Sequence, residues 1–216
     1  MARSAFPPPN IIEQPGVCGV REDTVCLADM AAEQPPGRAL DMGTGTGYIA
    51  IRLAQQGWQV VATDVSPRAL RLARRNAQAN AVDIEIIESD LFSAVDGLFD
   101  VILFNPPMRA DETELSRLLT SILRKSPAVS ALLMRLTHGW LGNRRLPFLL
   151  DFCRQARNHL AAGGRLLLAV GPEEADALVA ELPEARLVEF RAVQSIPHLG
   201  IADVRFEIAA GSPRSA

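Results

Sequence analysis

One stretch of this sequence decides the fold that it predicts: Asp41-Met42-Gly43-Thr44-Gly45-Thr46-Gly47. The stretch joins a short strand pattern, Arg38–Met42, to a helical pattern, Tyr48–Gln56. Glycines spaced G-x-G-x-G let the backbone turn tightly and let a ligand approach without a Cβ in the way. A dinucleotide fingerprint would need glycine where Tyr48 stands. The stretch therefore predicts a strand–turn–helix unit for a nucleotide-like ligand and disfavours a dinucleotide.

Strand and helix patterns alternate along the rest of the chain. Such alternation predicts a mostly parallel sheet with helices on both faces, and two late strands without a helix between them predict a terminal antiparallel hairpin. We therefore expect an α/β, Rossmann-like fold with a seven-stranded sheet. The expected strands are Arg38–Met42, Gln59–Asp64, Ile84–Glu88, Asp100–Phe104, Arg165–Val170, Arg186–Gln194 and Val204–Ala209, and the later helices are Pro67–Asn80, Pro147–Leu160 (ended by Gly163-Gly164) and Glu173–Glu181.

The domain organisation follows from proline, glycine and helical patterns. We expect an extended N-terminal arm at residues 1–14, one domain at residues 15–210 and a disordered tail at residues 211–216. Residues 111–145 contain helical patterns split by Ser126-Pro127 and interrupt the unit after the fourth strand. A long insertion beside a site is more often a lid or a substrate wall than a linker, so we expect a helical lid.

Composition narrows the class of partner. The chain has 216 residues, 48% of them apolar and 22% charged, with a net charge of −3 and a pI near 5.7. This balance suits a globular domain and disfavours a nucleic-acid partner. No apolar run reaches the roughly 18 residues of a membrane span. The three cysteines form no metal-binding motif, so we expect no metal and a cytoplasmic location. The oligomeric state is not indicated.

Two acids at strand ends suit a nucleoside. Asp64 ends the second strand, where a carboxylate can accept hydrogen bonds from both hydroxyls of a ribose. Asp90 follows the third strand, where a carboxylate can accept from an adenine amino group while Leu91 lies against the ring. Each acid alone is also explained as the cap of a helix or turn. The complete set, in this order, favours nucleoside binding.

A different chemistry follows the apolar run Phe99–Phe104, in Asn105-Pro106-Pro107. The side-chain carbonyl of Asn105 can accept one N–H of an amide or amine, and the backbone carbonyl of Pro106 can accept the other. Two such bonds would orient the nitrogen lone pair, which is catalysis by positioning. Asn-Pro is also a common turn signal. After a glycine loop and a buried strand, it predicts a holder for an amino group.

These motifs, in this order, resemble class I methyltransferases that use S-adenosylmethionine (SAM). They look most like the HemK-type branch, which methylates glutamine side chains of translation release factors. The run from Pro15 to Thr24 is similar to the segment that precedes the fold in that family. The resemblance covers Pro15–Pro107 well and Pro147–Ala209 in architecture.

The resemblance implies roles for individual residues. Thr24 would touch the methionyl end of SAM, Asp41 and Gly43 would line the methionyl pocket, and Asn105 with Pro106 would be catalytic. The expected cofactor-binding residues are Thr24, Asp41, Gly43, Gly45, Gly47, Asp64, Asp90, Leu91 and Asn105, and the expected substrate-binding residues are Asn105, Pro107, Met108 and Arg109.

The chain departs from the family after Asn-Pro-Pro. Met108 stands where the family has an aromatic residue that would stack on a planar acceptor. Together with the 111–145 insertion, this favours an acceptor other than the family's glutamine: an amine or amide nitrogen of a small molecule or side chain. The alternatives are a release-factor glutamine, an exocyclic adenine or guanine amine in RNA or DNA, an NAD-linked oxidoreductase, and a non-catalytic SAM-fold module.

Overall fold

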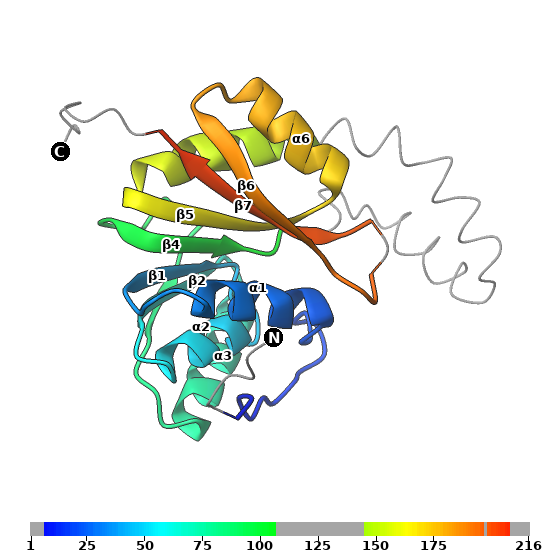
Figure 1. Ribbon diagram of the computed structural model, residues 1–216. Coiled ribbons are helices and arrows are strands. Elements are labelled where there is room, and N and C mark those ends of the chain that lie inside the picture. Colours follow the sequence, from blue (N-terminus) through cyan, green and yellow to red (C-terminus); the bar gives the residue numbers. More distant parts are fainter. Residues whose placement is uncertain (1–6, 107–144, 197, 208–216) are drawn as a thin grey trace. The chain divides into compact units, whose positions relative to one another are not determined.

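The computed structural model describes residues 7–106, 145–196 and 198–207 (Figure 1). The chain forms two compact units, residues 1–106 with 154–216 and residues 107–153, and the sheet belongs to the first. The expected lid lies outside the described residues except for its last residue, and the expected tail lies outside them entirely. Both therefore stay predictions.

The sheet has seven strands in the order β3-β2-β1-β4-β5-β7-β6. The pairings from β3 to β5 are parallel, and β7 is antiparallel to both of its neighbours. This confirms the predicted Rossmann-like fold with a terminal antiparallel hairpin. The strands are β1 (Arg38–Met42), β2 (Gln59–Asp64), β3 (Glu85–Glu88), β4 (Phe99–Phe104), β5 (Leu160–Val170), β6 (Ala185–Ala192) and β7 (Gly200–Phe206).

Helices cover both faces of the sheet. Figure 1 shows α1, α2 and α3 on one face and α6 on the other, and the contacts of these helices with the strands agree. A further helical segment spans residues 145–158. None of the described helices has the length and apolar character needed to cross a bilayer. The helix bounds are α1 (Glu22–Ala32), α2 (Tyr48–Ala54), α3 (Pro67–Ala79) and α6 (Pro172–Glu181).

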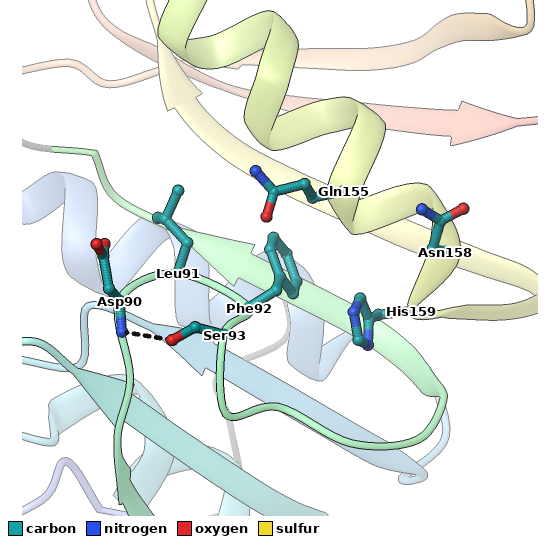
Figure 2. Close-up of a pocket in the computed structure, with 7 residues that line it drawn as sticks. All are labelled: Asp90, Leu91, Phe92, Ser93, Gln155, Asn158 and His159. Atoms are coloured by element: carbon teal, nitrogen blue, oxygen red, sulfur yellow. Dashed lines mark hydrogen bonds between the residues drawn. The ribbon is translucent and has the colours of Figure 1, made fainter. Parts of the chain in front are cut away.

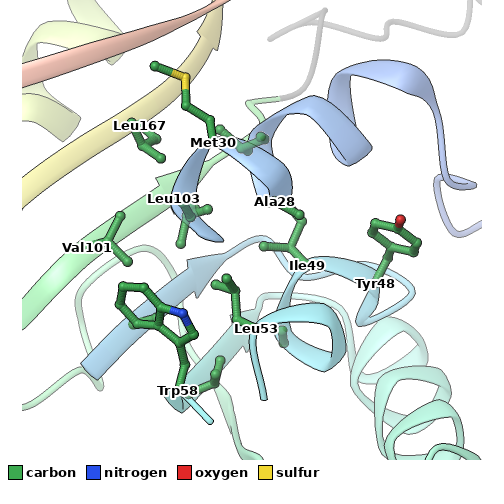
Figure 3. Close-up of a cluster of buried hydrophobic side chains, with 14 of the residues drawn as sticks. Ala28, Met30, Tyr48, Ile49, Leu53, Trp58, Val101, Leu103 and Leu167 are labelled. Atoms are coloured by element: carbon green, nitrogen blue, oxygen red, sulfur yellow. The ribbon is translucent and has the colours of Figure 1, made fainter. Parts of the chain in front are cut away.

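The core lies between the sheet and the first two helices (Figure 3). Met30 of α1, Leu53 of α2 and Leu103 of β4 are fully buried there. Burying a side chain of this kind contributes about 1.5–3 kcal/mol to folding. This apolar layer holds the ends of the central strands in fixed register, and those ends carry the candidate site.

Two elements differ from the prediction on the carboxyl side. β5 begins at Leu160, so Gly163-Gly164 lies inside a strand instead of ending a helix. The register between β4 and β5 shifts from Phe99 opposite Leu160 to Val101 opposite Arg165, so β5 is irregular there. A Cβ on Gly164 would come within 3.0 Å of two backbone oxygens, which is why this irregularity requires glycine. β7 begins at Gly200, ahead of the predicted Val204.

The helix α1 is absent from the prediction. Its sequence, Glu22–Ala32, has apolar residues that are mostly small, so its amphipathic pattern is weak. Tertiary packing makes the helix, because Leu27, Ala28 and Met30 are fully buried against the core.

Candidate functional site

The candidate site lies at the carboxyl ends of the central parallel strands. The register places Met42 at the end of β1 beside Thr63 of β2 and beside Phe104 of β4. Asp64, the last residue of β2, is opposite Glu88, the last residue of β3. The segments that follow these four strands therefore leave one edge of the sheet. In open α/β sheets, ligands bind outside this edge.

The glycine loop turns through left-handed backbone conformations. Gly43, Gly45 and Gly47 have φ of +68°, +54° and +84°, which side-chain-bearing residues rarely adopt. The N–H of Thr44 donates to the carbonyl of Thr63 at 2.8 Å and fixes the loop to β2. A Cβ on Gly47 would lie 3.2 Å from Ala73 of α3. The loop therefore has one close-packed side and one side open to a ligand.

Asp41 is buried beneath the glycine loop. One carboxylate oxygen accepts the hydroxyl of Thr44 at 2.6 Å and the N–H of Ala50 at 3.2 Å. Burial disfavours the charged form and raises the pKa of Asp41 to about 7, although both hydrogen bonds act in the opposite direction. Asp41 thus ties the loop to α2, and its carboxyl can change charge near neutral pH.

Asp64 ties the glycine loop to the beginning of the next helix. Its two oxygens accept the N–H of Gly45 at 3.0 Å and the N–H of Ser66 at 2.9 Å. Ser66 in turn is the N-cap of α3, because its hydroxyl accepts the N–H of Ala69. A carboxylate has about four acceptor positions, so Asp64 keeps capacity for a ligand hydroxyl. Its capping role and its proposed ribose role are therefore compatible.

The segment after β3 forms a turn built around Ser89. The Ser89 hydroxyl donates to the carbonyl of Leu91 at 2.7 Å and accepts the N–H of Ala94 at 3.0 Å. These bonds hold Leu91 at φ +48°, an uncommon conformation for a leucine. Asp90 is exposed beside it, with its N–H bonded to Ser93 at 3.2 Å. The turn presents an acid and an apolar side chain next to each other.

A pocket of about 400 Å³ opens beside this turn (Figure 2). Phe92 and His159 form a stacked pair, with ring centroids 4.8 Å apart and ring planes inclined by 15°. Gln155, Asn158 and His159 were not predicted as site residues, because no motif marks them and only the fold brings them beside Asp90. The lining residues are Asp90, Leu91, Phe92, Ser93, Gln155, Asn158 and His159.

Val65 is a further residue beside the site that the sequence motifs did not predict. This residue follows Asp64, and 67% of its surface is exposed, more than any other large hydrophobic residue that the structure describes. An apolar side chain between a strand-end acid and the Ser66 cap offers a surface for a planar ring. The sequence does contain a signal for Val65: neither the strand-end acid before it nor the helix cap after it requires an apolar residue between them.

Asn105 and Pro106 follow β4 at the same edge of the sheet. Asn105 is partly exposed and Pro106 is buried. No other residue in the described ranges forms a hydrogen bond with the Asn105 side chain, so its carbonyl oxygen is available to a ligand. The other three expected substrate residues, Pro107, Met108 and Arg109, lie outside the described residues.

Thr24 lies in the first turn of α1. Its hydroxyl accepts the N–H of Arg21 at 3.4 Å, and its own N–H donates to Asp23 at 2.9 Å. Within the described part of the chain, these hydrogen bonds stay local and none reaches the glycine loop. The structure therefore gives Thr24 a helix-capping role, and its contact with a cofactor stays a prediction.

The sheet order, the glycine loop and the acids at the ends of β2 and β3 define a class I SAM-dependent methyltransferase fold. Residues 11–132 match the methyltransferase small domain family, and the chain belongs to that family. Its relatives include proteins named as release factor or protein glutamine methyltransferases, in agreement with the HemK-type resemblance of the sequence motifs.

Two relatives and one solved structure illustrate the similarity. The chain is 35% identical to the release factor glutamine methyltransferase of Lactococcus lactis over 76% of this chain and 59% of that protein. It is 44% identical to a putative protein N5-glutamine methyltransferase of Methanocaldococcus jannaschii, over 43% and 48%. The crystal structure of a ribosomal protein L11 methylase from Lactobacillus delbrueckii shares the fold (TM-score 0.61, 22% identity, 90% and 83% covered). The chain thus spans about half to three-fifths of these two relatives' length.

Proposed function

We propose that this protein transfers a methyl group from SAM to an amide or amine nitrogen held by Asn105 and the backbone carbonyl of Pro106. The observation that carries the proposal is the position of Asn105 at the end of β4, where no other residue in the described ranges hydrogen-bonds its side-chain amide. β4 is hydrogen-bonded to β1, whose own end begins the glycine loop. Donor and acceptor sites would then be neighbours on one edge of the sheet.

The described residues fit SAM. The positive-φ glycines leave a cradle without side chains, and among the described residues a Cβ at Gly43 would meet only the Phe104 ring, at 3.6 Å or more. Asp64 has acceptor capacity for ribose hydroxyls, and Asp90 is an exposed acceptor for an adenine amine. Val65 and Leu91 offer apolar surface for the adenine ring. Ionised Asp41 beneath the loop would favour the ammonium group of the methionyl end.

The chemistry that we assign to Asn105 and Pro106 is positioning. When bound, SAM supplies a methyl group that is already electrophilic because its sulfur carries a positive charge. Two carbonyl oxygens that each accept one N–H would direct the nitrogen lone pair at that methyl group. The nitrogen becomes acidic as the C–N bond forms, so the proton can leave to solvent without a strong base. Pro106 has no N–H, so it presents an acceptor without a competing donor.

Two acceptor classes are supported by different observations. The relatives named as glutamine methyltransferases favour the side-chain amide of a protein glutamine. Met108 after Asn-Pro-Pro, where an aromatic residue would stack on a planar amide, favours another nitrogen, such as that of a small molecule. Both classes use the same pair of carbonyl acceptors. We also propose a cytoplasmic location, since all three cysteines are free thiols.

A labelled-methyl assay tests the proposal and separates the acceptors. The purified protein is incubated with methyl-labelled SAM and, in parallel, with a release-factor peptide containing Gly-Gly-Gln, a metabolite extract, and nucleic acid. Label in the peptide identifies glutamine, and label in the extract identifies a small-molecule nitrogen. Label in nucleic acid identifies a base amine and contradicts both proposed classes. A protein that binds SAM and labels none of the pools contradicts the proposed catalysis.

A further inference from the structure

Two asparagines, Asn76 of α3 and Asn80 at its C-cap, hold the N-terminal segment by its backbone. The Asn80 side chain accepts the N–H of Asn10 at 2.8 Å and donates to the carbonyl of Asn10 at 2.7 Å. The Asn76 side chain does the same with Ile12, accepting its N–H at 3.0 Å and donating to its carbonyl at 3.0 Å. Each amide thus imitates the paired hydrogen bonds of a neighbouring β-strand.

The two pairs match because of helix and strand geometry. Positions four apart on a helix are separated by about 6 Å along its axis, which is close to the span of two residues of extended chain. Residues 10 and 12 therefore lie antiparallel to α3, in register with Asn80 and Asn76. An extended segment without regular secondary structure gains four hydrogen bonds in this way, which fixes its path.

Asn76 also reaches the glycine loop. Its side chain is fully buried, and its second donor bonds the carbonyl of Thr46 at 2.8 Å. Thr46 lies between Gly45 and Gly47. One amide thus joins α3, the N-terminal segment and the glycine loop. Both N–H donors and the oxygen of the Asn76 side chain are hydrogen-bonded, so removing this buried side chain would break several hydrogen bonds.

The N-terminal segment then continues over the same loop. The Glu13 carboxylate accepts the N–H of Val20 at 3.0 Å and closes residues 13–20 into a turn. Within that turn, a Val17 methyl group and the Cys18 carbonyl each lie 3.8 Å from the position of a Cβ on Gly45. Residues 10–20 therefore pass alongside the glycine loop, with Asn76 and Asn80 at one end.

We propose that Asn76 and Asn80 are positioning residues of the cofactor site: they hold residues 10–20 against the glycine loop and so set the affinity for the amino-acid portion of SAM. The proposal rests on the proposed function, because it requires SAM in the glycine loop. It assigns residues 10–20 to the methionyl side of the site. The adenine side, around Val65 and Leu91, is built by other elements.

Two variants test this without removing a fully buried side chain. Asn80→Ala deletes one of the two asparagine pairs at a partly exposed position. Ile12→Pro removes the N–H that Asn76 accepts and leaves α3 unchanged. Gln78→Ala is the matched control, because Gln78 is exposed on the same helix between the two asparagines. Calorimetry measures the binding of S-adenosylhomocysteine and of 5′-methylthioadenosine, which lacks the amino-acid portion.

The two ligands separate positioning from general loosening. We expect Asn80→Ala and Ile12→Pro to weaken S-adenosylhomocysteine by about tenfold and 5′-methylthioadenosine by less than about twofold, with Gln78→Ala unchanged. Hydrogen exchange of residues 10–20 should increase in the same two variants. An unchanged affinity for S-adenosylhomocysteine, or an equal loss for both ligands, overturns the proposal alone. If the unaltered protein binds neither ligand, the cofactor assignment fails instead, and this proposal with it.

Discussion

The two sides of the candidate site use their polar groups in opposite ways. On the cofactor side, Asp41 is bonded to Thr44 and Ala50, and Asp64 is bonded to two backbone N–H groups. On the acceptor side, the Asn105 amide has no hydrogen-bond partner in the described ranges. The polar groups of the cofactor side are hydrogen-bonded within the protein, whereas the amide of the acceptor side keeps its hydrogen-bonding capacity for a ligand.

This difference separates the entropic cost of binding the cofactor from the cost of holding the acceptor-side amide in place. A loop that is fixed before the ligand arrives loses little conformational entropy on binding. A side chain left free must be held by its neighbours until the acceptor supplies the missing bonds. Changes to the hydrogen-bonded acids of the cofactor side should therefore alter affinity and stability together, while changes at Asn105 should alter the rate alone. The following predictions test that separation.

The largest effect is expected at Asn105. Asn105→Ala removes one of the two proposed acceptors and should lower the rate of methyl transfer by about 10²–10³-fold, because a small misplacement of the nucleophile is costly. The affinity for SAM should stay within about threefold, and the melting temperature should be unchanged, since no described bond is lost. Single-turnover kinetics and calorimetry provide both quantities. A variant as active as the parent protein would end the positioning mechanism.

A smaller but still large effect is expected at Asp64. Asp64→Ala removes the ribose acceptor and frees the Gly45 N–H, so SAM should bind about 10–100-fold more weakly. Glu88→Ala is the matched control, since Glu88 is the opposing strand-end carboxylate and is exposed. Calorimetric titration of both variants compares them directly. Equal losses in the two variants would show that Asp64 acts only through the net charge.

Val65 tests the apolar part of the cofactor side. Val65→Ser should weaken SAM by about three- to tenfold, because an apolar surface for adenine is lost. Thermal stability should be almost unchanged, since 67% of this side chain is already exposed. Val188→Ser is the control, a valine that is 47% exposed on β6, far in sequence from the site. An affinity loss of the same size at Val188 would refute the assignment.

Asp41 gives the cofactor side a pH dependence. Its pKa in the folded protein is about 7, above the value near 4 of an unfolded chain, so the folded state binds the extra proton. The stability of the ligand-free protein should therefore fall as the pH rises from about 4 to 7 and should level off above that range. Asp41→Asn should remove this pH dependence, because an amide does not ionise in this range. Its side-chain oxygen can still accept both hydrogen bonds, so the structure should be kept. Urea unfolding of both proteins at pH 5 and pH 8 measures the difference.

Sequence patterns predicted the central strands and placed the glycine loop and the acids at their ends, whereas the cofactor-binding roles of these residues stay predictions. The central strands are continuous apolar runs, and the glycines and strand-end acids have local reasons to be where they are, so a linear pattern contains them. Pro67, where the predicted helix begins, is also the first residue of α3, because proline suits the first helical position. Each of these features needs only near neighbours in the chain.

The features that sequence patterns missed depend on distant contacts. The helix α1 forms because its small apolar face is covered by the sheet. Gly163-Gly164 suits a helix stop and a strand irregularity equally well, and only the approach of Phe99 decides between them. Gln155 and His159 belong to the pocket because the chain folds the end of their helical segment beside the Ser89 turn. No local sequence pattern encodes these long-range contacts.

In the turn held by Ser89, the backbone strain at Leu91 opposes the proposed binding role of its side chain. At φ +48°, Leu91 has a backbone conformation that costs a leucine about 1–2 kcal/mol more than a glycine. Leu91→Gly should therefore raise the melting temperature slightly while it weakens SAM, because the ring loses its apolar neighbour. Selection for thermal stability alone would favour glycine at this position. In the proposed role, the leucine lowers the stability of the fold in exchange for an apolar surface against the adenine ring.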